Sequence, residues 1–107
     1  MAAIPSEVTG VIRRYIDIIK GDIAIDRVIL FGSYAKGTYH KDSDIDLAII
    51  SPDYRDADFI DNMTKLLCKT SGLDADIQPV PFSVEDYQEP VGIMEEILRT
   101  GIELQIA

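Results

Sequence analysis

The start of the chain shows two kinds of apolar pattern. Apolar residues first recur every three or four positions, which is the spacing of one helical face, and Gly21 follows as a stop. This pattern predicts a helix over residues 6–20. The next stretch is rich in β-branched residues and ends in an unbroken apolar run over residues 28–31, directly before Gly32. Such a run is typical of a strand covered on both faces, so we expect a central strand over residues 23–31.

The middle of the chain changes from a glycine turn to an alternating pattern. Residues 32–37 have a glycine at each end and fit a turn with about one helical turn. Residues 38–43 are polar and predict a loop. Residues 44–50 alternate at their start and end apolar, which predicts a strand whose Asp44 and Asp46 share one face.

Helical spacing then returns before a third strand. Residues 56–70 predict a helix, with Cys68 expected in the core. Residues 73–82 predict a strand. Because Pro79 and Pro81 cannot donate ladder hydrogen bonds, this strand should lie at a sheet edge or contain a bulge.

The end of the chain carries one more helical stripe and a short apolar segment. The segment, residues 102–106, fits a terminal strand. The stripe consists of Val91, Met94, Ile97 and Leu98. We expect it to pack on the chain's own sheet, and contact with a partner protein is the alternative. The order of elements predicts an α/β sheet with helices packed mainly on one face, in a single domain over residues 1–107.

Composition narrows the class of protein. At 107 residues, with 47% hydrophobic and 27% charged residues, the chain fits one folded domain. Its formal net charge of -9 is opposite in sign to the basic surface that binds phosphate backbones, which argues against extended nucleic-acid binding. Cys68 is the single cysteine, and neither a basic leader nor a run of about eighteen apolar residues is found. We therefore expect a soluble cytoplasmic protein without a membrane segment.

Two short motifs carry candidate chemistry. A glycine turn after a strand frees backbone N–H groups, and with the Ser33 hydroxyl beside it, Gly32 and Ser33 form a candidate phosphate site. The same pair is common in ordinary turns and indicates little alone. Further along, Asp44 and Asp46 lie about 6.6 Å apart on one strand face. Such carboxylates can share Mg²⁺, which neutralises charge in nucleotidyl transfer, although acidic residues are also common at solvated strand ends.

A third carboxylate would complete a two-metal site. Asp76 lies at the start of the predicted third strand and can project beside the pair if the two strands are neighbours. Asp74 shares its alternation face and is the competing candidate. Lys36 lies in the loop where triphosphate charge would be placed and is a candidate phosphate contact.

The two motifs together resemble the minimal nucleotidyltransferases of the DNA polymerase β superfamily. The resemblance rests on GSYAKG at residues 32–37, SDIDL at residues 43–47 and the spacing between them, and the element order extends it over residues 6–82. It implies a polymerase-β-type fold with a mixed sheet and flanking helices, a nucleoside triphosphate donor such as ATP, and two Mg²⁺ ions.

By position, the resemblance also implies roles for individual residues. The residues that it implies contact the nucleotide are Gly32, Ser33, Lys36 and Ser43. The metal-binding and catalytic carboxylates are Asp44, Asp46 and Asp76, of which Asp76 activates the acceptor hydroxyl.

Small stand-alone members of this family resemble the antitoxin half of toxin–antitoxin modules. The resemblance implies a protein adenylyltransferase that moves AMP from ATP onto a tyrosine of a helical HEPN-domain toxin. Two alternatives stay open: an aminoglycoside-type transferase, which usually carries an added helical domain, and an idle binding module that neutralises its partner by contact. The nucleobase, the acceptor and a possible oligomeric state are not determined by the sequence.

Overall fold

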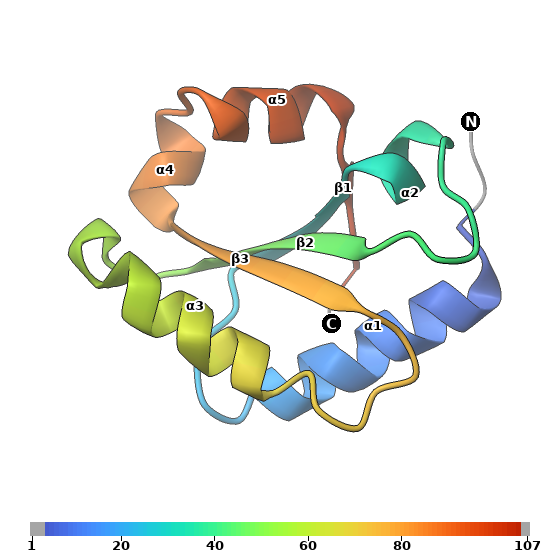
Figure 1. Cartoon of the computed structure of the whole chain (residues 1–107). Coiled ribbons are helices and arrows are strands. Elements are labelled where there is room, and N and C mark those ends of the chain that lie inside the picture. Colours follow the sequence, from blue (N-terminus) through green and yellow to red (C-terminus); the bar gives the residue numbers. More distant parts are fainter. Residues whose placement is uncertain (1–3, 106–107) are drawn as a thin grey trace.

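A computed structural model describes residues 4–105 of the chain. The sheet has four strands. Figure 1 shows helices on both sides of it. The elements in chain order are α1 (Ser6–Ile19), β1 (Arg27–Phe31), α2 (Ser33–Lys36), β2 (Ile45–Ser51), a short 3-10 turn η1 (Asp56–Asp58), α3 (Phe59–Cys68), β3 (Ile77–Ser83), α4 (Val84–Gln88), α5 (Ile93–Thr100) and β4 (Ile102–Glu103).

The sheet is mixed and has the order β3-β2-β1-β4. β1 lies in the interior and runs antiparallel to both β2 and β4, whereas β2 and β3 are parallel. The expected central strand and edge strand are therefore confirmed. The Ile45 N–H donates to the Asp76 carbonyl at 2.8 Å. Parallel ladder bonds alternate along a strand, so Pro79 and Pro81 fall on the positions that face the open edge, where no N–H is needed.

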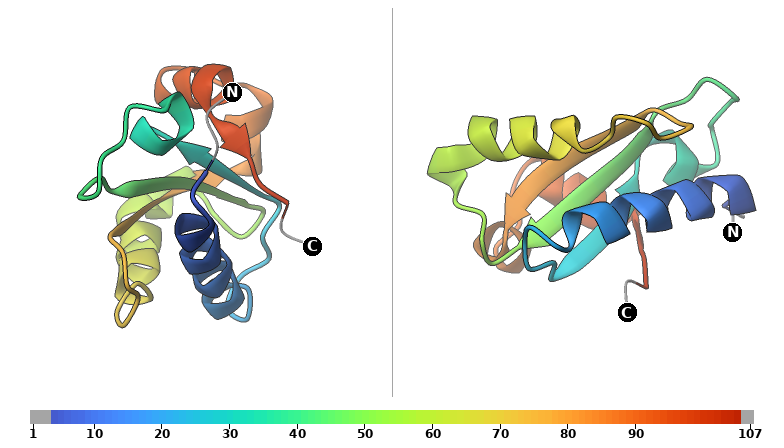
Figure 2. Two further views of the ribbon diagram at one scale, coloured as in Figure 1. Left: turned by 90° about the vertical axis from the view of Figure 1, so that its right-hand side faces the viewer. Right: turned by 90° about the horizontal axis from the view of Figure 1, so that it is seen from below.

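Two apolar clusters hold the layers together. The larger cluster packs α1 and α3 against one face of the sheet through residues such as Tyr15, Leu66 and Leu47. The Tyr15 hydroxyl donates to the Leu66 carbonyl at 2.7 Å and ties the two helices together. On the other face, Met94 and Ile97 of α5 pack against the strands. The two longest helices thus share one face, as expected, and the shorter α5 covers the other (Figures 1 and 2).

Several boundaries differ from the predicted ones. The first strand begins at Arg27 rather than residue 23, and the third at Ile77 rather than residue 73. The predicted terminal strand is reduced to Ile102–Glu103, with residue 106 outside the described residues. None of the helices within residues 4–105 is long and apolar enough to cross a membrane.

Burial in the last two long helices also differs from expectation. Cys68 is exposed, so its expected place in the core is wrong. Of the predicted apolar stripe, Met94 and Ile97 are buried in α5, whereas Leu98 of α5 is 38% exposed and Val91, which precedes α5, is 77% exposed. The stripe therefore packs on the sheet only in part.

Candidate functional site

Gly32 links the end of β1 to α2 in a conformation that suits glycine. Its φ of 73° lies in the region that side chains rarely adopt. A Cβ atom at this position would overlap Oδ2 of Asp46 on the neighbouring strand. The absence of a side chain at Gly32 is therefore what lets the Asp46 carboxylate lie against the turn.

The turn after Gly32 is one short helix held at both ends. The Lys36 N–H donates to the Gly32 carbonyl at 3.1 Å, and Gly37 ends the helix with a φ of 78°. Because this is the first bond of the helix, the N–H group of Ser33 is left outside the helix's own bonding. The predicted turn with one helical turn is confirmed.

The polar loop that follows is ordered by its own contacts. The rings of Tyr34 and Tyr39 are stacked with centroids 4.5 Å apart. The Ser43 hydroxyl accepts a hydrogen bond from the His40 N–H at 2.8 Å. Ser43, a predicted nucleotide contact, thus also fixes the loop that leads into β2.

Three aspartates occupy neighbouring positions at the start of β2 and β3. Ile45 pairs with Ile77, and Asp46 pairs with Gln78. Both isoleucines are buried in the α1–α3 side of the core, so the alternation places Asp44, Asp46 and Asp76 on the opposite face. The backbone bond from Ile45 to Asp76 puts Asp76 level with Asp44 on the adjacent strand.

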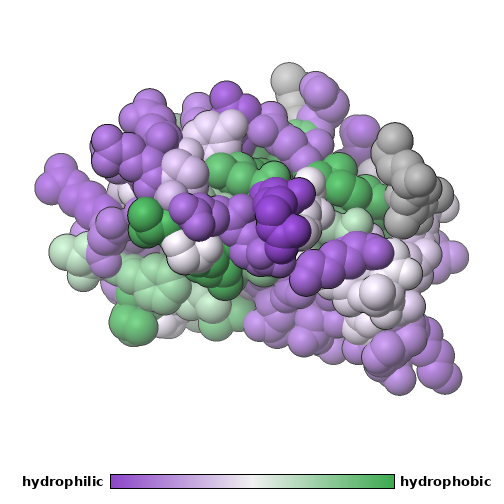
Figure 3. All heavy atoms as spheres, turned by 90° about the horizontal axis from the view of Figure 1, so that it is seen from above, coloured by the Kyte–Doolittle hydropathy of each residue, from purple (hydrophilic) through white to green (hydrophobic). Residues whose placement is uncertain are grey.

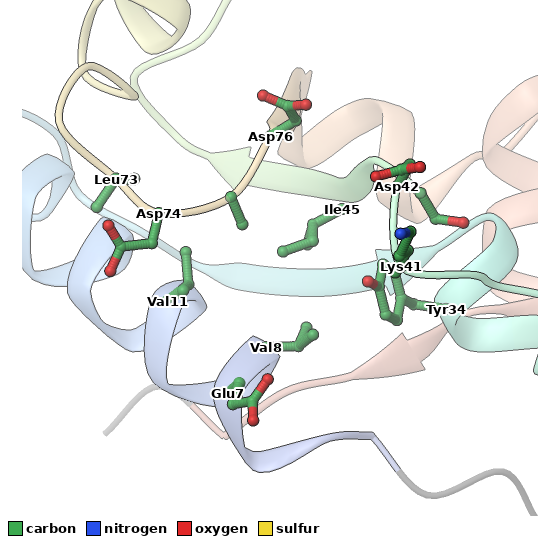
Figure 4. Close-up of a pocket in the computed structure, with 12 residues that line it drawn as sticks. Glu7, Val8, Val11, Tyr34, Lys41, Asp42, Ile45, Leu73, Asp74 and Asp76 are labelled. Atoms are coloured by element: carbon green, nitrogen blue, oxygen red, sulfur yellow. The ribbon is translucent and has the colours of Figure 1, made fainter.

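Asp74 lies differently from Asp76. It belongs to the bend before β3, and Figure 4 shows its carboxylate over α1 beside Val11, whereas Asp76 points away from that helix. The backbone thus favours Asp76 over Asp74 as the neighbour of the aspartate pair.

The electrostatics of the pair fit a cation site. Burial raises the pKa of Asp46 above its usual value, and repulsion from Asp44 raises it further. Two hard carboxylate oxygen donors that repel each other on one face are ligands of the kind that Mg²⁺ takes. Within residues 4–105, no three His, Cys, Asp or Glu side chains already converge as a metal-binding group, so the carboxylates are neighbours without a formed ligand cage.

Lys36 has a partner that the sequence did not indicate. Its Nζ lies 3.8 Å from the Glu96 carboxylate of α5, and both side chains are about half exposed. Arg99 hydrogen-bonds the same carboxylate and, as the main cause, lowers the pKa of Glu96. Lys36 is therefore held toward α5, on the face of the sheet that carries Asp44 and Asp46.

A cavity of about 670 Å³ opens beside Asp76, next to the loop at residues 41–43 and the first turns of α1. Its lining combines apolar residues such as Val8 and Ile45 with the carboxylates of Glu7 and Asp74 (Figure 4). Helical periodicity places Val8 on the apolar face of the predicted first helix. The pattern does not show which end of that helix borders a cavity.

Comparison with known proteins shows a family that matches most of the chain. A family model described as a nucleotidyltransferase domain matches residues 12–101. A Methanocaldococcus jannaschii protein assigned as a protein adenylyltransferase is 52% identical over 48 residues, which are 42% of this chain and 44% of that protein. The protein adenylyltransferase MntA of Shewanella oneidensis is 43% identical over 56 residues, which are 50% of this chain and 37% of MntA. The chain thus covers less than half the length of both relatives.

Solved structures are similar over more of the chain. A mutant of the toxin–antitoxin pair MntA–HpeT matches at 26% identity and a TM-score of 0.55, over 88% of this chain and 71% of that chain. A toxin–antitoxin structure with AMP-PNP matches at 25% identity and a TM-score of 0.58, over 89% of this chain and 73% of that chain. A Sulfolobus solfataricus protein assigned as a nucleotidyltransferase shares the fold at 15% identity and a TM-score of 0.67, over 96% and 86% of the two chains.

Proposed function

Because the chain belongs to the nucleotidyltransferase domain family, we propose that it moves AMP from ATP onto a hydroxyl group of a partner protein, with a tyrosine of a helical HEPN-type toxin as the acceptor. The names of the two curated relatives support a protein acceptor. The match to a toxin–antitoxin structure with AMP-PNP supports an adenine nucleotide as donor and a toxin as partner. In this proposal the chain acts as the antitoxin.

The observation that carries the proposal is the position of Asp44, Asp46 and Asp76 on one sheet face, with the Asp46 carboxylate against the Gly32 turn. In the proposed reaction, the acceptor oxygen bonds to the α-phosphorus as the bond from that phosphorus to the bridging β-phosphate oxygen breaks. Pyrophosphate leaves, and AMP stays on the acceptor.

The residues near the turn divide the tasks of this reaction among them. Asp44 and Asp46 would hold Mg²⁺, with Asp76 as the third carboxylate, and the metal when bound neutralises charge on the phosphates. Asp76 accepts the proton of the attacking hydroxyl. The Ser33 hydroxyl and N–H donate to phosphate oxygens, and Lys36 and Ser43 complete the nucleotide contacts.

The direct test measures transfer by intact mass. The chain is incubated with ATP, Mg²⁺ and a small helical protein encoded by the neighbouring gene, and a mass gain of one AMP on that protein is expected. Asp46→Asn should lower the rate on the order of a thousandfold, since it removes charge stabilisation at the reacting phosphorus. The matched control is Asp17→Asn, because Asp17 is an exposed α1 residue whose one ion pair among residues 4–105 is with Lys20.

The outcomes separate the parts of the proposal. Full transfer by Asp46→Asn contradicts the assignment of the carboxylates. In parallel incubations with UTP, CTP or GTP in place of ATP, transfer of UMP, CMP or GMP without any transfer of AMP from ATP contradicts the choice of nucleotide. Transfer to a small molecule but never to protein favours the aminoglycoside-type alternative.

A further inference from the structure

An apolar groove lies at the far end of the sheet from Asp44 and Asp46. It has a volume of about 310 Å³ and lies between the first turns of α3 and α5. Its floor includes Phe82, which pairs with Ile50 of β2. Ile50 is five residues along β2 from Ile45, or about 16 Å by strand rise, so the groove is separate from the carboxylate site.

The walls of the groove expose apolar side chains that α3 and α5 leave uncovered. Val91 is 77% exposed, Ile93 is 60% exposed and Phe59 is 39% exposed, and all three line the groove. Ile60, next to Phe59, is 76% exposed. Figure 3 shows apolar atoms at the surface on the left of this view, over the N-terminal ends of these helices. Clustered apolar exposure of this kind is typical of an interaction surface.

The charged side chains that line the groove are both acidic. They are Asp56 and Asp86, and neither forms an ion pair with any of residues 4–105. Asp86 accepts a hydrogen bond from the Ser83 N–H at 3.1 Å, which fixes its position. The neighbouring Asp86 carboxyl is the main cause that raises the pKa of Asp56, and nearby Glu85 raises it further. A cation between these two carboxylates would offset their mutual repulsion.

We propose that this groove binds a segment of a partner protein that carries an arginine or lysine among apolar side chains. The apolar side chains of the segment cover Val91, Ile93 and Phe59, and its cation lies between Asp56 and Asp86. A second copy of this chain fits less well, because each copy has a formal net charge of -9 and would bring like charge to an acidic groove. The inference does not rest on the transfer reaction.

The test uses the full chain in chelator without nucleotide. A phage-displayed library of random peptides is selected on the chain and depleted on its Ile93→Asp variant. We expect recovered peptides to combine apolar residues with an arginine or lysine. A synthetic consensus peptide is then titrated against the parent and variants by fluorescence anisotropy, and thermal melts show that each variant is folded.

Matched variants assign the contacts. Ile93→Asp should weaken binding roughly tenfold or more, because a charge replaces an apolar contact. Asp56→Asn should lower the affinity for the basic peptide roughly threefold or more. It should leave unchanged the affinity for a peptide in which glutamine replaces the cationic residue. Ile18→Asp is the control, since Ile18 is 42% exposed on α1 and does not line the groove.

Three results would overturn the proposal. One is a selection that yields no peptide dependent on Ile93. Another is a consensus peptide that contains no arginine or lysine, or one whose affinity does not change with Asp56→Asn. The third is a dimer of the parent in light scattering that becomes a monomer in the Ile93→Asp variant. That result would assign the groove to a second copy of the chain. None of these results bears on AMP transfer, which is measured separately.

Discussion

At the scale of single residues, Gly32 meets two requirements that no other residue type meets together. Its backbone has a positive φ, and the space that a Cβ would take is filled by the Asp46 carboxylate. The conformation of the turn and the position of a proposed metal ligand therefore depend on the same missing atom.

Gly32→Ala should lower the free energy of unfolding by about 2 kcal/mol or more, because an alanine is strained at this φ and displaces the Asp46 side chain. Nucleotidyl transfer should fall with it. Urea unfolding measures the first effect. Gly10→Ala is the control: Gly10 lies inside α1 with open space around it, so this change should stabilise the protein by about 0.5–1 kcal/mol. Equal stability of the parent and Gly32→Ala would contradict the close approach of Asp46.

Asp46 should also make stability depend on pH. Its pKa is raised in the folded state, so the folded chain holds this proton more tightly than the unfolded chain does. Its stabilising contribution is complete below the unfolded pKa and is lost as pH rises through the folded pKa. In chelator, Asp46→Asn should therefore gain stability relative to the parent as pH rises from below the unfolded pKa of about 4 through the folded pKa, and the gain should then level off.

Urea unfolding at a series of pH values checks this trend. Asp17→Asn is the control for the removal of one negative charge from an acidic chain, because Asp17 is 66% exposed. A stability difference between Asp46→Asn and the parent that does not change with pH would show that Asp46 has an ordinary environment.

At the scale of elements, α4 shows how a local motif places a short helix. The Asp86 N–H donates to the Ser83 hydroxyl at 3.0 Å, and the Ser83 N–H donates to the Asp86 carboxylate at 3.1 Å. This capping box begins α4 directly where β3 ends. It also holds Asp86 at the wall of the apolar groove.

Ser83→Ala should lower the free energy of unfolding by about 1 kcal/mol, since it removes one of the two reciprocal bonds and leaves the Asp86 N–H without its acceptor. Ser71→Ala should change it little, because Ser71 is exposed in a turn. Thermal or urea melts of both variants measure the difference. An equal effect of the two changes would mean that the capping box does not stabilise α4.

Much of this element pattern could be predicted from the sequence. The helix α1 follows from periodicity, because it packs a full apolar face on the sheet. The strands β1 and β2 follow from their apolar runs, because both of their faces are covered. The exposed Cys68 and Ile60 could not be predicted in this way. Periodicity shows which side of α3 is apolar, but not how much of that side a neighbouring layer covers.

Some parts of the candidate site can be predicted from the sequence, and others cannot. The Asp44–Asp46 pair and the Gly32 turn can be predicted from local spacing, since each lies within one short segment. The position of Asp76 depends on which strands are neighbours, and the contact between Lys36 and Glu96 joins elements far apart in the chain. Pairings of this kind are set by tertiary packing, so a single sequence does not define them.

At the scale of the whole molecule, ligand binding should couple the site to global stability. With Mg²⁺ and ATP at about a hundred times the dissociation constant, the parent should gain roughly 2.7 kcal/mol. For a domain of this size, that gain corresponds to a rise in melting temperature of order ten degrees. Asp46→Asn should gain far less, so the ligand should reverse the stability order expected in chelator.

Thermal melts of both proteins, in chelator and with Mg²⁺ plus ATP, provide the measurement. ATP in chelator separates nucleotide binding from metal-dependent binding. If the parent gains nothing from Mg²⁺ with any nucleoside triphosphate, and Asp46→Asn is clearly less stable in chelator, the three carboxylates are structural.

The two sheet edges have a consequence for how the protein behaves at high concentration. An exposed strand edge is a template for adding strands from other molecules, which is how edge-to-edge aggregation begins. Here Pro79 and Pro81 remove N–H donors along the β3 edge, and β4 at the other edge has only two residues. Both edges are poor templates. The parallel strands β2 and β3 can therefore lie at one edge of the sheet, with an apolar groove at the end of β3. Neither edge offers a continuous row of backbone donors and acceptors for fibril growth.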